Sequence, residues 1–230
     1  MTHRTVPDRL ILGQILHFLD DPGEGDDSHS YAHFPQGALW IVEGRVAAVG
    51  YRRAVESAIA PERLAAAERF DYGDRLVLPG LVDTHCHYPQ SAVIASFGRQ
   101  LLDWLNTYTF PAEMAFRDPE VARATARYFL DRLLAHGTTT ASVFATVHAA
   151  SVEAFMAEAD ARQLRMLTGK VMMDRHAPPE LCDTVADAER DCVALIERWH
   201  GRGRLRYTIT PRFAPTSTSA QLALAGELYA

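Results

Sequence analysis

Two histidines separated by one residue, His85 and His87, are the side chains whose spacing first indicates chemistry. They follow a short apolar run that begins after Pro79-Gly80. Residues i and i+2 of a strand project to the same face, so both imidazoles can reach one ion, and imidazole nitrogen suits zinc. The spacing alone also fits two surface or capped histidines, but the end of a strand favours a metal site. We predict that His85 and His87 bind Zn²⁺ and that Cys86, between them, faces away from it.

Three further side chains have the chemistry to bind a flat heterocycle: Gln90, Arg212 and Phe213. The Gln90 amide offers a hydrogen-bond donor and an acceptor. The Arg212 guanidinium can donate to a carbonyl oxygen through its planar fork, and the adjacent ring of Phe213 can stack on a base. Each has an ordinary alternative, namely a solvated loop amide, an ion-paired surface arginine and a core phenylalanine. The pattern alone favours the solvated amide for Gln90, whereas Arg212 and Phe213 close a predicted strand and so lie at the rim that carries the histidines. We predict that all three bind the substrate, for Gln90 on the basis of the family resemblance described below.

Two other residues near strand ends receive weaker predictions. Lys170 lies near the end of a predicted strand, and we favour the ordinary role of a charged strand-end residue for it. His148 follows a predicted strand, where a lone histidine is more often a hydrogen-bonded structural residue. It remains a candidate for lining the pocket.

The first third of the sequence is typical of a small β-rich domain, which we place at residues 1–78. Apolar runs alternate with polar residues, and Glu43-Gly44 fits a two-residue hairpin turn between two of them. The acidic, Gly- and Ser-rich residues 20–30 cannot bury apolar surface and predict a mobile loop.

Residues 79–230 change to an alternation of strands and helices. Strands are predicted at 138–147, 165–173 and 204–213, and helices at 119–137, 150–164 and 184–201. Pro119 suits the first turn of its helix, and Gly137 suits its end. Such alternation predicts an α/β fold whose apolar parallel strands are buried on both faces. We assign four β-α units of a barrel-type fold.

The length of the chain fits half a barrel rather than a whole one. A closed (β/α)8 barrel takes about 250 residues, and the chain has 230 in all. Of these, the β-rich domain takes residues 1–78, so only 152 remain for the barrel. The last segment is apolar and helical without a polar ending, so we expect the natural protein to continue beyond Ala230.

Composition excludes several classes of protein. The net charge is -6 and the basic residues are scattered, which argues against nucleic acid as a partner. No apolar run approaches the roughly 20 residues of a membrane span. The three cysteines follow no disulfide or CxxC pattern. We expect a cytoplasmic protein with a small-molecule substrate.

Four segments carry a family resemblance: PGLVDTHCH at 79–87, YPQ at 88–90, LLDWLNTYTFPAE at 101–113 and PRFAPT at 211–216. In this order they resemble the guanine deaminases of the amidohydrolase superfamily. The resemblance implies that residues 1–78 are the N-terminal part of a composite β-sandwich and that residues 79–230 are the first half, four β-α units, of a metal-dependent (β/α)8 barrel. It also favours the charged strand-end role of Lys170, because guanine deaminases resemble the mononuclear branch rather than the members in which a carboxylated lysine bridges two metals.

The resemblance implies hydrolytic deamination of guanine to xanthine and ammonia by a zinc-bound hydroxide. It also implies that Arg212 binds the guanine O6 and that Phe213 lines the face of the base.

The same resemblance implies that the site is incomplete within these residues. A third histidine with a nearby glutamate, a fourth histidine and a metal-bound aspartate would come from later strands, so no catalytic residue is assigned here. We expect this chain alone to bind metal weakly, and the parent protein to be a homodimer. Two alternatives stay open: another amidohydrolase, such as a pyrimidine or triazine deaminase or a cyclic amidase, or a non-catalytic truncated scaffold.

Overall fold

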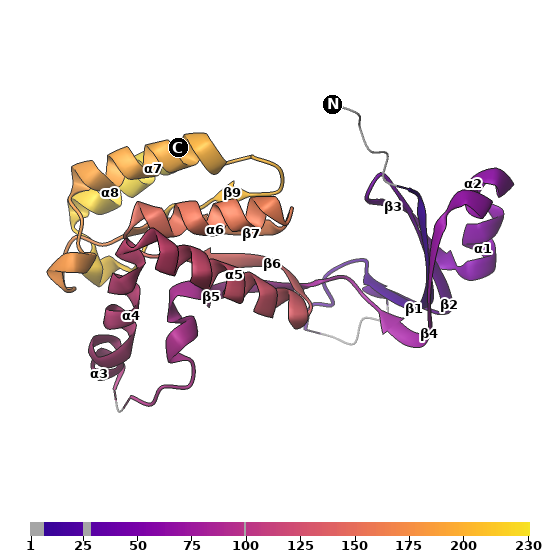
Figure 1. Ribbon diagram of the computed structural model, residues 1–230, viewed down its shortest axis with the longest axis horizontal. Helices are drawn as coiled ribbons and strands as arrows, with labels where there is room; N and C mark the ends of the chain where they lie inside the picture. The colour runs from indigo at the N-terminus through magenta and orange to yellow at the C-terminus, as the bar shows by residue number, and fades with distance from the viewer. Residues whose placement is uncertain (1–6, 25–28, 99) are drawn as a thin grey trace. The chain divides into compact units, whose positions relative to one another are not determined.

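The computed structural model describes residues 7–24, 29–98 and 100–230. The contacts divide the chain into two compact units, Met1–Pro79 and Gly80–Ala230 (Figure 1). Each unit has its own sheet and its own apolar core. In the described part of the chain, every helix is too short or too polar to cross a membrane.

The first unit is built on one four-stranded sheet with the order β3-β2-β1-β4. Its strands are β1 (Arg9–Phe18), β2 (Tyr31–Val42), β3 (Arg45–Tyr51) and β4 (Glu68–Val77), and the helices α1 (Arg52–Ser57) and α2 (Pro61–Ala66) connect β3 to β4. The pair β1–β4 is parallel, and the other two pairs are antiparallel. The β-rich prediction is confirmed, and the two helices are an addition to it.

Turns in this unit follow the local sequence. Glu43 and Gly44 both have positive φ, 51° and 74°, as a type I′ hairpin turn requires. The turn joins β2 to β3 with Val42 opposite Arg45, so the hairpin prediction is confirmed. In the acidic segment, residues 20–24 are exposed, while residues 25–28, on which the mobile-loop prediction partly falls, lie outside the described residues.

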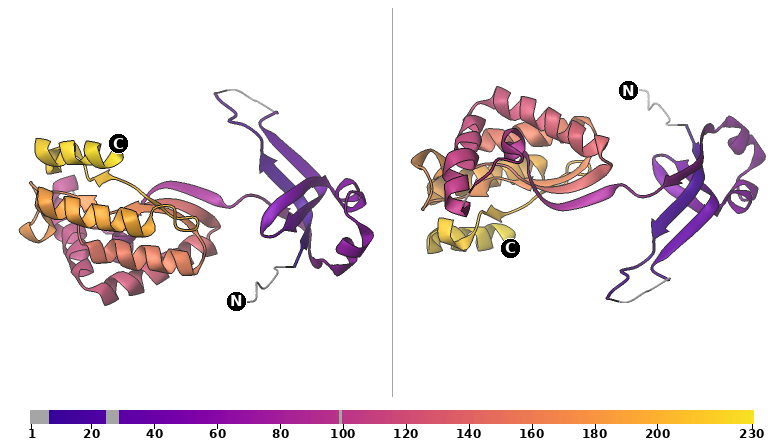
Figure 2. Two further views of the ribbon diagram at one scale, coloured as in Figure 1. Left: turned by 90° about the horizontal axis from the view of Figure 1, so that it is seen from above. Right: turned by 90° about the horizontal axis from the view of Figure 1, so that it is seen from below.

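The second unit has a parallel sheet with the order β5-β6-β7-β9 and a short parallel pair, β8-β10. The strands are β5 (Leu81–His87), β6 (Thr138–Phe144), β7 (Arg165–Gly169), β8 (Val171–Met172), β9 (Arg206–Tyr207) and β10 (Thr210–Pro211). The long helices are α5 (Pro119–Ala135), α6 (Ala149–Ala161), α7 (Val185–Trp199) and α8 (Ser219–Tyr229). Figure 2 shows α5, α6 and α7 side by side along the sheet. The predicted α/β alternation with a parallel sheet is confirmed.

Two predicted strands are interrupted. The sequence predicts single strands at 165–173 and 204–213, but the chain leaves the ladder between β7 and β8 and between β9 and β10. The backbone of Thr208 presses against Gly169, where an added Cβ would lie 1.8 Å from the Thr208 oxygen. The Lys170 N–H donates to the Tyr207 hydroxyl at 3.1 Å instead of to a neighbouring strand. This crowding breaks both strands at the same level.

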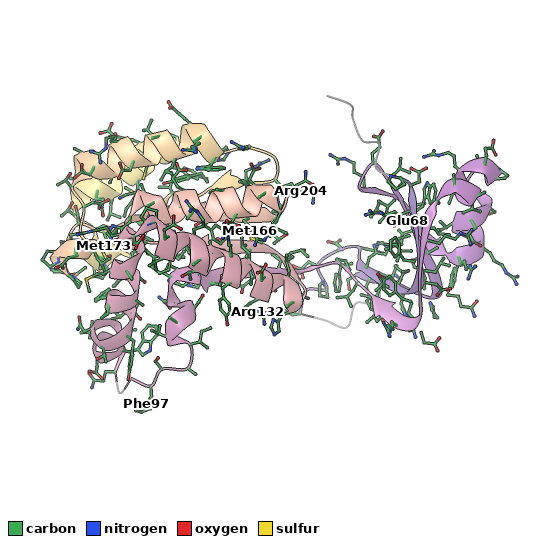
Figure 3. The ribbon with its side chains drawn as sticks, viewed as in Figure 1. Glu68, Phe97, Arg132, Met166, Met173 and Arg204 are labelled. Atoms are coloured by element: carbon green, nitrogen blue, oxygen red, sulfur yellow. The ribbon has the colours of Figure 1, made fainter. Side chains whose placement is uncertain are left out.

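The core of the second unit lies between the sheet and its helices. It contains small and sulfur-containing side chains of the strands, such as Ala141 and Met166, together with Ala126, Phe155 and Leu195 of the helices. Met166 and, from a second buried cluster, Met173 are labelled in Figure 3. Asp118 caps α5 by accepting from the Glu120 N–H at 2.8 Å. Gly137 has φ 85° just past the end of α5, so the predicted helix end is confirmed.

Burial on both faces was predicted for every strand, and this is wrong for β5. Leu81 and Val82 are 51% and 63% exposed. Among the described residues β5 pairs only with β6, so it is an edge strand. Beyond its free edge, the described residues provide no further strand to cover these apolar side chains.

Candidate functional site

Strand β5 brings the two predicted metal ligands together at its carboxyl end. The Nε2 atoms of His85 and His87 lie 3.3 Å apart. Phe144, opposite His87 on β6, stacks on the His87 ring with centroids 4.6 Å apart and contacts His85 as well. Asp83 accepts from the His85 N–H at 3.0 Å and holds the end of the strand.

The separation of the two nitrogens fits zinc. Two tetrahedral zinc ligands at about 2.0–2.1 Å from the metal lie about 3.3–3.4 Å from each other. The imidazole pair therefore matches two corners of a tetrahedral zinc site. Across the described residues, no group of three or more His, Cys, Asp or Glu side chains is arranged to hold a metal. By its spacing the pair could supply two ligands of such a site.

The surroundings of the pair affect its protonation. Burial lowers the pKa of His87 to about 4, and the positive charge of Arg212 lowers it further. A neutral imidazole is the form that binds metals. Cys86 packs toward the helix side of the sheet, where its thiol lies 3.7 Å from the Ser142 oxygen, as strand alternation predicts. Burial, together with the charge of Asp83, raises the pKa of this thiol to about 12.

Gln90 follows β5 in the short helix η1 (Tyr88–Val93). Tyr88 anchors this helix, because its buried hydroxyl donates to the Ser151 oxygen at 2.6 Å. The Gln90 Nε2 atom lies 3.2 Å from His87 Nδ1 and donates to Glu113 Oε1 at 3.3 Å. Gln90 thus connects the histidine pair to a buried carboxylate.

That carboxylate comes from a helical segment in three parts: α3 (Leu101–Trp104), the π-helical turn η2 (Leu105–Thr109) and α4 (Phe110–Met114). The Phe110 N–H donates to the Leu105 oxygen, five residues back, which defines the wider turn. Pro111 follows directly, and because proline lacks an N–H and its ring clashes with the preceding turn, a regular α-helix cannot continue through it. The irregular turn accompanies the inward placement of Phe110 and Glu113, both of which are buried.

Arg212 lies just past β10, where its backbone N–H donates to the Met172 oxygen at 3.1 Å. Its Nη1 and Nη2 atoms donate to the two Glu113 oxygens at 2.6 and 3.1 Å. The ring of Phe110 lies under the guanidinium, 5.7 Å from centroid to carbon. Arg212 and Glu113 are 99 residues apart in the sequence and form a bidentate pair.

The structure therefore brings together four of the five predicted site residues. His85 contacts His87, His87 contacts Gln90, and Glu113 links Gln90 to Arg212. The fifth, Phe213, is next to Arg212 in the chain and is 47% exposed, and its stacking role stays a prediction.

Lys170 and His148 are not part of this network. Both line a separate polar cavity of about 430 Å³, and buried Lys170 is ion-paired with Asp183. The preferred interpretation of Lys170 as a charged residue without a metal-bridging role agrees with this pairing.

Sequence reasoning missed Glu113, Phe110 and Phe144 as parts of the site. Phe144 ends an ordinary apolar strand, and nothing in its local pattern distinguishes it. Glu113 did carry a signal, because it is an acid within the apolar segment 101–116, and buried acids in proteins are almost always paired. That signal predicts a cationic partner without identifying Arg212.

A family model described as the amidohydrolase family matches residues 76–229, and the chain belongs to this family. Guanine deaminase of Escherichia coli strain K12 is 52% identical over 158 residues, which are 69% of this chain and 36% of that protein. The solved structure of E. coli guanine deaminase has a TM-score of 0.89 and 41% identity, and the match covers 96% of this chain and 50% of that chain. The chain thus corresponds to the N-terminal part of these guanine deaminases and spans at most half of their length.

Two more distant structures share the fold. Guanine deaminase from Clostridium acetobutylicum, solved with guanine in its active site, has 24% identity and a TM-score of 0.82, covering 96% of this chain and 50% of that one. An adenosine deaminase from Xanthomonas campestris with bound zinc has 18% identity and a TM-score of 0.75, covering 97% and 48%.

Proposed function

We propose that this chain provides part of the active site of a guanine deaminase, which hydrolyses guanine to xanthine and ammonia. The observation that carries the proposal is the linked geometry of the two groups of residues. A histidine pair with zinc-ligand spacing is connected through Gln90 and Glu113 to a buried, oriented guanidinium. The similarity to guanine deaminases over most of the chain supports the choice of guanine as the substrate.

His85 and His87 would hold the metal, and Gln90, Arg212 and Phe213 would hold the base. Zinc bound there would activate water for hydrolysis. Arg212 would donate to the carbonyl oxygen of guanine, Gln90 would pair with the edge of the ring, and Phe213 would cover its face. The ring of Phe144 stacks on the ring of His87 and thereby orients it.

The test measures zinc content and guanine turnover in the natural full-length protein. We expect His85→Ala and His87→Ala each to lose bound zinc, measured by atomic absorption, and to lose xanthine formation. Cys86→Ala is the matched control on the same strand, because its side chain packs on the helix side of the sheet. It should keep both zinc and turnover. Unchanged zinc in both histidine variants, or ammonia release from triazines or pyrimidines but not from guanine, would contradict the proposal.

A further inference from the structure

Glu113 makes three side-chain hydrogen bonds, more than any other residue of the candidate site as the described residues define it. Its side chain is 1% exposed, and that of Arg212 is 9% exposed. Glu113 accepts two hydrogen bonds from Arg212 and one from Gln90. A carboxylate buried to this degree is costly unless it is paired and hydrogen-bonded, and here both conditions are met.

The arrangement fixes the guanidinium on two sides. The carboxylate of Glu113 holds its edge, and the ring of Phe110 supports its face. Phe110 and Glu113 are three residues apart on α4, so one helix supplies both supports. Arg212 therefore lies in a defined plane before any ligand arrives.

The pairing also changes what Arg212 can recognise. A free arginine fork binds carboxylates and phosphates through two parallel hydrogen bonds. In this structure Glu113 occupies that fork, and the guanidinium and carboxylate charges sum to zero. Three of the five guanidinium N–H groups remain, which suits single hydrogen bonds to a neutral carbonyl oxygen.

We propose that Glu113 is a positioning residue that, by filling the Arg212 fork, makes the site select neutral oxo-heterocycles over anionic ones. The inference rests on the proposed function, since it assigns Arg212 to the substrate. It adds a specificity determinant from a helix outside the strand ends. Glu113 acts through Arg212, and its own oxygens are occupied by protein donors.

The test compares two oxopurines that differ in charge near neutral pH, hypoxanthine, which is neutral, and urate, which is a monoanion. Dissociation constants are measured by calorimetry on the zinc-loaded full-length protein, so the readout does not depend on turnover. We expect the wild type to bind hypoxanthine more tightly. In Glu113→Gln, hypoxanthine should bind more weakly and urate more tightly, so that the ratio of the two constants shifts at least tenfold.

Control variants separate this role from simple structural damage. Glu113→Asp keeps the charge and should retain most of the wild-type preference. Glu113→Gln/Arg212→Met removes both charges, so its preference for the anion should disappear again. Arg212→Met alone leaves the carboxylate unpaired and should weaken urate more than hypoxanthine, which provides the test if Glu113→Gln does not fold.

Equal weakening of both ligands in Glu113→Gln, or in Arg212→Met where Glu113→Gln does not fold, would overturn the proposal, because a purely structural role predicts this result. Failure of the proposed function is seen separately, as absence of guanine deamination by the wild type. A wild type that deaminates guanine while Glu113→Gln keeps the wild-type ratio would leave the proposed function intact and reject the role of Glu113.

Discussion

Two buried cations lie at neighbouring strand ends of the second unit and have different surroundings. Lys170 directly precedes β8, and Arg212 directly follows β10, its parallel partner. Lys170 is paired with Asp183 on the side of α7, whereas Arg212 is paired with Glu113 beside the histidines. The Lys170 side chain lines the polar cavity with Asp183, whereas that of Arg212 contacts Phe110 and Glu113.

The two pairs use their cations differently. The Lys170 ammonium is a point charge, and burial lowers its pKa. Its partner Asp183 keeps one oxygen, Oδ1, without a hydrogen-bond partner among the described residues. The Arg212 guanidinium is held at its edge and face and still has N–H groups to offer. A buried ion pair is thus no sign of function by itself, and the free donors and neighbouring groups decide its role.

The largest expected effect concerns the stability of the Lys170 pair. Asp183→Asn leaves the ammonium unpaired in a buried position, which should lower the free energy of unfolding by about 3–5 kcal/mol. Urea unfolding followed by circular dichroism measures this change. The double variant Lys170→Met/Asp183→Asn removes the buried charge and should recover most of the loss. A change below about 1 kcal/mol in Asp183→Asn would mean that the pair is solvated and contributes little.

Next in size is the loss of transition-state binding at the other pair. Arg212→Met in the full-length protein should lower kcat/KM for guanine. The fall corresponds to a loss of about 2–4 kcal/mol of transition-state stabilisation, because a buried hydrogen bond to the carbonyl is lost. Steady-state kinetics below the unfolding temperature of the variant gives the value. Bound zinc should stay at the wild-type level. Wild-type kcat/KM in this variant would remove Arg212 from the site and erase the distinction between the two pairs.

A smaller effect is expected at Asp118, the N-cap residue of helix α5, which takes no part in either ion pair. Asp118→Ala removes the hydrogen bond to the Glu120 N–H at the start of α5 and should cost about 1 kcal/mol of unfolding free energy. Thermal unfolding measures it. Since α5 packs on the helix side, kcat/KM for guanine should not change. A drop in kcat/KM equal to that of Arg212→Met would indicate that general destabilisation accounts for both.

The smallest effect is a pH dependence on the Lys170 side. Burial, assisted by the charges of Arg117 and Lys170, lowers the pKa of His148 below its ordinary value. The unfolded chain then binds this proton more readily, so the free energy of unfolding should fall as pH drops through about 6.5, by at most about 1.4 kcal/mol per pH unit. His148→Gln should reduce this slope between about pH 7 and 5. Identical slopes in urea titrations of wild type and variant would contradict the assignment.

Local sequence determined a large part of this protein. Strand alternation is a property of the extended backbone, so HxH at the end of an apolar run was enough to predict that His85 and His87 share a face. The turn at Glu43-Gly44 and the end of α5 at Gly137 followed from the positive φ that these positions require. The two kinds of unit followed from the change in hydrophobic period near residue 79.

Tertiary structure decided the rest, because it depends on which distant atoms meet. The break at Lys170 arises from the backbone of Thr208 pressing on Gly169, and no property of residues 165–173 encodes that contact. The pairing of Glu113 with Arg212 joins residues 99 positions apart, and the partner of a buried charge is fixed by packing rather than by periodicity. The sequence by itself thus determined which residue types stand at the strand ends, whereas only the folded chain decided that the Arg212 fork is filled by Glu113 and that Lys170 is paired with Asp183.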